Sequence, residues 1–231
     1  MKKEIAKARN EMVGLFFSAL MHEINQPLNA VKIGTDGVLL KTEIDPDYEI
    51  STKGTVAVLS RISKSIERID SVLKQFSKYQ DDGSFEGNGY DTISNIAKQS
   101  YNLFKSKIAS HGIMVREIET KKCTSRSIIN PVALEMMINC YLLAAINSFD
   151  FDENVENKEI LISSTFEVGY NVMNIAINSK KAIYCLQNPG KCVEEQDEYV
   201  LAEIFAKNFG AEVEFVIDER GLFMIRIKVK N

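Results

Sequence analysis

Residues 21–32, Met-His-Glu-Ile-Asn-Gln-Pro-Leu-Asn-Ala-Val-Lys, contain one of the two histidines of the chain, His22. A carboxylate, Glu23, follows it directly, and Pro27 stands five residues later. An exposed imidazole whose proton is held on one ring nitrogen by a carboxylate keeps a lone pair on the other nitrogen and can act as a nucleophile. Proline leaves the carbonyl of Glu23 without its helical partner, which favours a bend at this step. The residue types therefore predict a nucleophilic histidine; the alternative is an ordinary surface histidine beside a tolerated proline.

The pattern around this segment predicts the helix that carries it. Apolar or small residues recur in alternating steps of four and three, which is a heptad seam. His22 is two residues from its nearest seam positions, about 200° around the helix from each. We therefore expect its side chain to point to solvent. The seam residues are Val13, Phe17, Leu20, Ile24, Pro27, Val31, Gly34 and Val38, and the expected neighbours on the exposed face are Ser18, Asn25, Gln26 and Asn29.

A second seam follows an Asp-rich turn at Pro46. The two seams predict an antiparallel helical hairpin. One hairpin leaves part of its apolar surface uncovered, and pairing two hairpins in a four-helix bundle buries that surface, so we expect a homodimer. The second seam consists of Leu59, Ile62, Ile66, Ile69, Leu73 and Phe76.

Residues 91–231 have a different pattern, with alternating strand-like segments between amphipathic helices. We expect residues 1–82 to form the hairpin, 83–90 a glycine-rich linker and 91–231 an α+β sandwich of a mixed sheet and helices. The expected elements are helix 92–112, strand 113–119, a buried helix 130–149, strands 159–168 and 172–177, helix 197–210, and strands 211–217 and 222–230.

The composition restricts the classes of partner. A formal net charge of −4 gives no electrostatic reason to expect nucleic acid. Four scattered cysteines without a CxxC pair indicate reduced thiols in a cytoplasmic protein, and neither a disulfide framework nor a zinc site. No apolar run approaches the roughly 20 residues that span a bilayer, so no membrane insertion is expected. Residues 1–12 begin basic and stay charged, and are expected to form the exposed first turns of a long helix.

The string His-Glu-Ile-Asn-Gln-Pro-Leu resembles the phosphoacceptor box of two-component sensor histidine kinases. Together with residues 67–79, Glu-Arg-Ile-Asp-Ser-Val-Leu-Lys-Gln-Phe-Ser-Lys-Tyr, the resemblance covers residues 10–80. It implies that His22 is the phosphorylated residue and that Glu23 is the general base and orienting group. Gln26 takes the position where the family places Thr, Asn or Gln to position water for dephosphorylating a partner.

The second half resembles the family's ATP-binding domain in outline but departs from its nucleotide-binding motifs. Asn139 matches the first of two motif asparagines, while the second, which in the family holds Mg²⁺, is Leu143, and leucine cannot coordinate a hard cation. In the Asp-x-Gly-x-Gly motif, Asn178, Lys180 and Ala182 stand at the Asp and Gly positions. Lysine lacks the backbone freedom of glycine. We expect Lys180 and Lys181 to lie in a solvated turn; the alternative is a remnant anion site.

The last motif of the family is a Gly-x-Gly at a helix N-terminus, where backbone N–H groups and the helix dipole hold phosphates. Glu195 and Asp197 occupy the glycine positions here. Carboxylates at a helix N-terminus compete for the place of an anionic phosphate. The stretch between the last two motifs is also too short for the family's usual ATP lid. The resemblance thus predicts a degenerate domain in which ATP binding has been lost.

Three functions follow from these features. The first is a dimeric histidine phosphotransfer protein, in which His22 exchanges a phosphoryl group with an aspartate of a response-regulator receiver domain. It needs no tightly bound cofactor, since Mg²⁺ comes with the receiver, and such transfers run through a loose transition state. The second is a sensor kinase that autophosphorylates with ATP. The third is a non-catalytic module that regulates a partner kinase.

Overall fold

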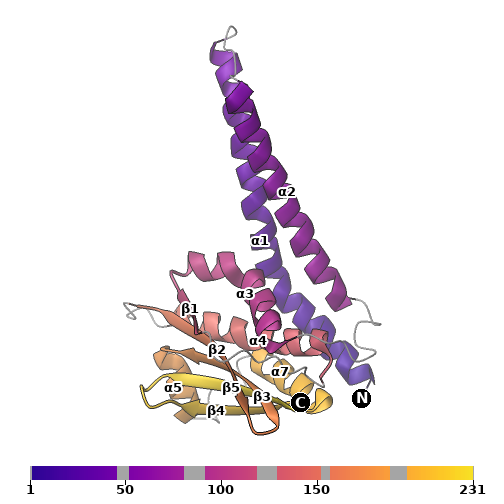
Figure 1. The fold of residues 1–231 in the computed structure, drawn as a ribbon, viewed down its shortest axis with the longest axis vertical. Coiled ribbons are helices and arrows are strands. Elements are labelled where there is room, and N and C mark those ends of the chain that lie inside the picture. The colour runs from indigo at the N-terminus through magenta and orange to yellow at the C-terminus, as the bar shows by residue number, and fades with distance from the viewer. Residues whose placement is uncertain are drawn as a thin grey trace.

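The computed structural model describes residues 2–45, 52–80, 92–118, 129–151, 157–187 and 197–230. A long helical hairpin projects from a body of helices and strands (Figure 1). This arrangement confirms the expected α+β class, with an N-terminal hairpin followed by a sandwich of a mixed sheet and helices. The predicted linker 83–90 and the candidate residue Glu195 lie outside the described residues.

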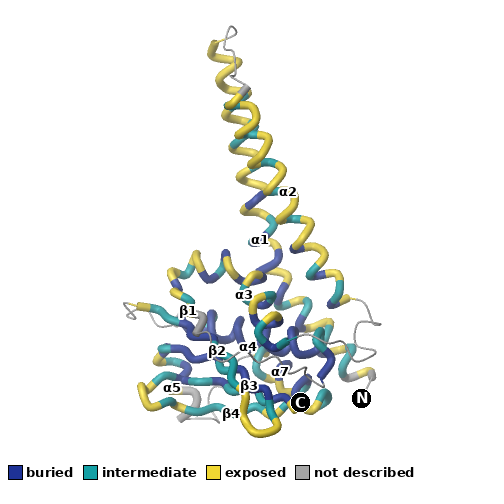
Figure 2. Tube along the Cα trace, viewed as in Figure 1, coloured by how far each residue is buried: buried dark blue, intermediate teal, exposed yellow. Residues whose placement is uncertain are grey.

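Two helices form the hairpin, α1 (Lys2–Ile44) and α2 (Thr52–Gln80). Pro27 lies inside α1, which continues as one helix to Ile44; the bend expected at the His22–Glu23 step stays a prediction. The half of the hairpin far from the body is largely exposed, whereas its base joins the buried core (Figure 2).

The first turns of α1 are more buried than the sequence suggests. We expect them to be exposed, but Ala8 and Met12 are buried because this end of α1 packs against α7 (Asp197–Phe209). One turn later, the ring of Phe16 lies edge-on to Tyr79 of α2 and to Phe104 of α3 (Ile93–Ser110), with centroid separations of 6.1 and 6.0 Å. The base of the hairpin is therefore part of the same hydrophobic core as the sandwich.

A five-stranded sheet forms the second layer, in the order β1-β2-β3-β5-β4. The β1–β2 pair is parallel and the other pairs are antiparallel. Along β5, alternate side chains are buried, so one face of the sheet is covered by the helices. The strands are β1 (Met114–Ile118), β2 (Glu159–Glu167), β3 (Tyr170–Ile177), β4 (Glu212–Ile217) and β5 (Phe223–Lys230).

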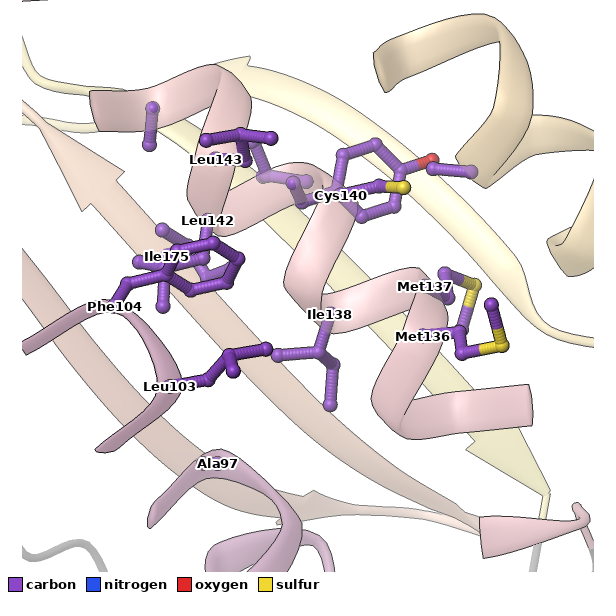
Figure 3. Packing of buried hydrophobic residues seen from close by; sticks show 14 of the residues in the cluster. Ala97, Leu103, Phe104, Met136, Met137, Ile138, Cys140, Leu142, Leu143 and Ile175 are labelled. Carbon is purple, nitrogen blue, oxygen red and sulfur yellow. The ribbon is translucent and has the colours of Figure 1, made fainter. Parts of the chain in front are cut away.

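The central helix of the body is α4 (Pro131–Ser148), followed by a short 3-10 turn, η2 (Phe149–Phe151). Its side chains fill the space between α3 and the sheet, and Phe104 of α3 and Ile175 of β3 are seen together on one side of it (Figure 3). Although α4 is long and apolar enough to cross a membrane, 83% of it is buried inside the fold, so it serves here as a core helix.

The helix boundaries follow local signals that the sequence shows. The Thr92 side chain accepts the N–H of Asn95 at the start of α3, and the Asn130 side chain accepts two N–H groups at the start of α4. Gly112 and Gly210 follow the ends of α3 and α7 with φ of +65° and +76°, a conformation that favours glycine. These boundaries agree to within two residues with the predicted helices 92–112, 130–149 and 197–210.

One helix was not predicted. Lys180 and Lys181 do not form a solvated turn but open α5 (Lys180–Gln187). The Ser179 hydroxyl accepts the N–H of Ala182 at 3.2 Å, and Ala182 is buried against the core. A serine cap and one buried alanine are weak signals in a sequence, which is why this short helix escapes prediction.

A buried carboxylate joins the base of the hairpin to α4. Glu135 is 2% exposed and accepts hydrogen bonds from Tyr79 Oη at 2.7 Å and Gln75 Nε2 at 2.9 Å. The ammonium of Lys78 lies 2.5 Å from its other oxygen. Asn139 Nδ2 donates to Tyr79 Oη at 2.9 Å. Burial and the adjacent carboxylate both raise the pKa of Tyr79 well above its ordinary value, so the phenol stays protonated and donates its proton to Glu135.

Replacing Tyr79 with phenylalanine removes the hydroxyl that joins Asn139 to Glu135. We expect the free energy of unfolding to fall by about 1–3 kcal/mol, because a buried carboxylate loses a donor and a buried amide loses an acceptor. Urea unfolding at fixed protein concentration measures the change. The control is Tyr170→Phe, whose hydroxyl donates to Glu212 at the surface and whose loss should cost within about 0.5 kcal/mol. Equal losses in the two variants would show that the buried network adds no particular stability.

Candidate functional site

His22 lies on α1, at the level where α3 of the sandwich packs against the hairpin. Its side chain is partly exposed, and the expected polar neighbours Asn25, Gln26 and Asn29 are exposed beside it. Gln26, one turn further along, places its Nε2 3.5 Å from His22 Nε2. The imidazole is therefore reachable from solvent, with an amide as its nearest polar group.

Glu23 has other partners than the sequence suggests. Its side chain is only 1% exposed. One carboxylate oxygen lies 2.6 Å from Arg68 Nη2 of α2, and the other accepts the backbone N–H of Ser106 of α3 at 2.5 Å. No hydrogen bond joins Glu23 to His22 in the described part of the chain. The role of general base beside His22 thus stays a prediction that requires the carboxylate to leave these partners.

Ser106 connects the two groups. Its hydroxyl donates to Gln26 Oε1 at 2.6 Å and accepts from Arg68 Nη2 at 3.0 Å. Ser106 is 3% exposed, whereas Gln26 is exposed and the Arg68 side chain is 43% exposed. These contacts form a polar cluster where α1, α2 and α3 meet, buried on the side of α3 and open to solvent on the side of the hairpin. Sequence reasoning missed both Arg68 and Ser106, because Arg68 occupies an ordinary outer position of the second heptad pattern and Ser106 is one of several polar residues on an amphipathic helix.

The two positions on α4 that match the family's asparagines are buried. Asn139 is 0% exposed and its amide donates to Tyr79 of α2, as described above. Leu143 is 3% exposed and belongs to the hydrophobic core. Both side chains lie in the interior of the fold in this arrangement.

The remaining candidate positions also have structural contacts or lie at the surface. Asn178 follows β3 and bridges to the start of β2, since its Oδ1 accepts the N–H of Glu159 at 2.9 Å and its Nδ2 donates to the Asn157 carbonyl at 2.5 Å. Asp197 is the exposed first residue of α7. Next to it, Glu198 accepts a hydrogen bond from Asn147 of α4 at 2.8 Å, which holds α7 against α4.

The same two helices share an aromatic cluster. Tyr141 of α4, Tyr199 of α7 and Phe215 of β4 lie with ring centroids 5.8–6.0 Å apart. Burial raises the pKa of Tyr141 and of Tyr199 above the ordinary value for tyrosine. The space between α4 and α7 therefore contains protein side chains that pack against one another.

No group of three or more His, Cys, Asp or Glu side chains that could hold a metal ion occurs among residues 2–45, 52–80, 92–118, 129–151, 157–187 and 197–230. Cys140 is a free, buried thiol whose pKa is raised by desolvation, so it behaves as a core residue. Cys123 and Cys192 lie outside the described residues.

No protein-family model and no curated protein matches the chain. The solved structures that resemble it include histidine kinases and a phosphotransferase. The catalytic domain of histidine kinase ThkA is 13% identical, with 62% of this chain and 97% of that chain covered and a TM-score of 0.48. A bacterial phosphotransferase is 10% identical; the match covers 94% of this chain and 95% of the phosphotransferase, with a TM-score of 0.47. ThkA in complex with the response regulator protein TrrA is 16% identical; the match covers 100% of this chain and 66% of that chain, with a TM-score of 0.46. With TM-scores below 0.5, these likenesses are too distant to decide what this chain does.

Proposed function

We propose that the chain is a two-component phosphorelay protein that is phosphorylated on His22 and exchanges the phosphoryl group with an aspartate of a response-regulator receiver domain. The observation that carries the proposal is the contrast between two sites. The imidazole of His22 is accessible and has Gln26 beside it. The described positions expected to bind ATP either have structural contacts or, at Asp197, place a carboxylate at a helix N-terminus.

The proposed reaction needs little from this chain beyond a positioned imidazole. The phosphorus–oxygen bond of the receiver's aspartyl phosphate breaks, a phosphorus–nitrogen bond forms at His22, and the aspartate is released as a carboxylate. The transition state is loose, so positioning and charge neutralisation supply most of the catalysis. The receiver would provide Mg²⁺ together with its acidic residues, and Gln26 would orient a water molecule in the dephosphorylation of the partner.

Loss of ATP binding is the second part of the proposal. Leu143 cannot coordinate Mg²⁺, and the side chain of Asn139 is 0% exposed, with its amide nitrogen bonded to Tyr79 inside the core. Asn178 would have to release two hydrogen bonds that hold the start of β2. Breaking these hydrogen bonds would cost about 0.5–1.5 kcal/mol each, which opposes binding.

The third part is a homodimer formed through the hairpin. Leu59, Ile66 and Leu73, at intervals of seven residues on α2, are 58%, 57% and 49% exposed. An apolar stripe of this kind on one chain favours burial against a second copy. The far half of the hairpin also has a groove of about 780 Å³, lined by small and apolar residues of both helices, such as Gly34 and Ala57, and by the cationic residues Lys41, Arg61 and Lys64. A second hairpin of the same sequence would cover both features.

His22→Gln should abolish phosphoryl transfer, because glutamine has no nucleophilic ring nitrogen. The experiment mixes the full chain with a receiver domain carrying labelled phosphate and follows label on the chain. His111→Gln is the matched control, since His111 is the other histidine and forms a 3.0 Å ion pair with Asp150 away from the candidate site. Label retained by the His22→Gln protein would disprove the site, and absence of label from the wild type would favour a non-catalytic module.

Mg-ATP should neither label the chain nor raise its melting temperature. A ligand present at about 100 times its Kd stabilises a protein by about 2.7 kcal/mol, so a genuine nucleotide site would give an obvious thermal shift. The complementary measurement is incubation with γ-labelled ATP. A clear shift together with label on His22 would establish the autophosphorylating kinase in place of the relay protein.

Ile66→Asp should dissociate the dimer, because it places an unpaired charge in the apolar stripe that the second copy covers. Ser71→Asp puts the same charge on an exposed position of α2 away from that stripe and should leave the dimer intact. Sedimentation velocity of both variants and the wild type gives the mass directly. A wild-type monomer, or a dimeric Ile66→Asp protein, would contradict the proposed interface.

A further inference from the structure

We propose that Ser106 is a positioning residue for His22, and that docking of the sandwich on the hairpin through this serine selects the tautomer of the imidazole. The inference rests on the proposed phosphorelay function and adds to it how the second domain acts on the reactive histidine. In the polar cluster, successive hydrogen-bonding contacts connect Arg68 to Ser106, Ser106 to Gln26, and Gln26 to His22.

The direction of each hydrogen bond in this cluster follows from chemistry. A guanidinium has only donors, so Arg68 Nη2 must donate to the Ser106 hydroxyl oxygen at 3.0 Å. The hydroxyl proton is then available to Gln26, and it is donated to Oε1 at 2.6 Å. An amide whose oxygen is fixed in this way must present its NH₂ group on the other side.

The NH₂ group of Gln26 faces His22 Nε2 at 3.5 Å. Because an amide nitrogen only donates, the facing ring nitrogen must be the acceptor. In the neutral imidazole, Nε2 therefore carries the lone pair and Nδ1 carries the proton. The geometry thus points to Nε2 as the nitrogen that attacks phosphorus. At 3.5 Å the contact is longer than the usual 2.9–3.0 Å, so an incoming phosphoryl group can displace it.

The same serine also fixes the distance between the domains. Its backbone N–H donates to Glu23 at 2.5 Å, and Arg68 donates to the same carboxylate at 2.6 Å. Glu23 is thereby used to hold α3 on α1 and α2. Since Ser106 belongs to the sandwich and Gln26 to the hairpin, the orientation of Gln26 depends on the sandwich being docked.

The first test reads the tautomer directly. Nitrogen-15 spectra of the full chain, labelled in histidine and recorded at a pH where the ring is neutral, distinguish Nδ1–H from Nε2–H. With only two histidines in the chain, His111→Gln leaves a single ring to assign. We expect His22 to carry its proton on Nδ1 in the wild type, and to become a mixture of tautomers in Ser106→Ala. Ser106→Thr keeps a hydroxyl and should restore the wild-type spectrum.

The second test measures the rate of phosphoryl transfer from a phosphorylated receiver. Ser106→Ala should slow it roughly two- to tenfold, the range for one neutral hydrogen bond. Gln26→Met removes the amide and keeps the length of the side chain. The double variant Gln26→Met with Ser106→Ala should transfer phosphate no more slowly than Gln26→Met alone, because both substitutions interrupt the same series of hydrogen bonds. Ser100→Ala is the matched control, since Ser100 is a buried serine on the same helix whose hydroxyl has no hydrogen-bond partner among the described residues.

The outcomes separate the two proposals. A wild-type tautomer and rate in Ser106→Ala, or an Nε2–H imidazole in the wild type, would overturn the positioning role while leaving the relay function intact. The same loss of rate in Ser100→Ala would assign the effect to helix packing and would also overturn the positioning role of Ser106. If the tautomer changes as expected but no variant, including the wild type, accepts phosphate, the positioning role holds and the relay function fails.

Discussion

The structure depends on a constraint that applies to two carboxylates, Glu23 and Glu135. Both are buried where the hairpin meets the sandwich, and a buried charge must be paired and hydrogen-bonded because desolvation costs several kcal/mol. Glu135 of α4 takes its partners from α2, and Glu23 of α1 takes its partners from α2 and α3. Each carboxylate is satisfied only when the two parts of the chain are docked, so their requirements fix how the hairpin sits on the sandwich.

This constraint explains why the base of the hairpin differs from its far end. At the base, Phe16 and Tyr79 pack with Phe104 of the sandwich in one core. Further out, the same heptad pattern leaves Leu59 and Ile66 exposed. One regular pattern thus serves two purposes, burial against the chain's own second domain near the body and an apolar stripe suited to a second copy beyond it.

The candidate site lies at the boundary between these regions. His22 is reachable from solvent, yet its neighbour Glu23 is held inside the interface and Gln26 is held by a serine of the other domain. Residues that are contiguous in the sequence are therefore divided in space. The carboxylate faces inward as a docking group, while the amide faces the imidazole.

Short-range signals in the sequence predicted much of the fold. Heptad spacing predicted the hairpin, alternation predicted the strands, and Gly112 and Gly210 marked the ends of two helices, since each of these effects depends on residues within a few positions of one another. The short helix α5 was missed because its cap and its single buried alanine are weak local signals.

The candidate site, like the fold, was predicted only where the signal is local in the sequence. The motif around His22 identified the histidine and its amide neighbour from residues in one string. By itself, the sequence determined most of the helices and strands, with α5 as an exception, and which side chains could do chemistry. Only the tertiary structure decided that Ser106 meets Gln26, eighty positions away along the chain, that Arg68 neutralises Glu23, and that Asn139 bonds to Tyr79. The physical reason is that the partner of a buried polar group is selected by three-dimensional packing, and the periodicity of a sequence carries no information about which distant residue will be there.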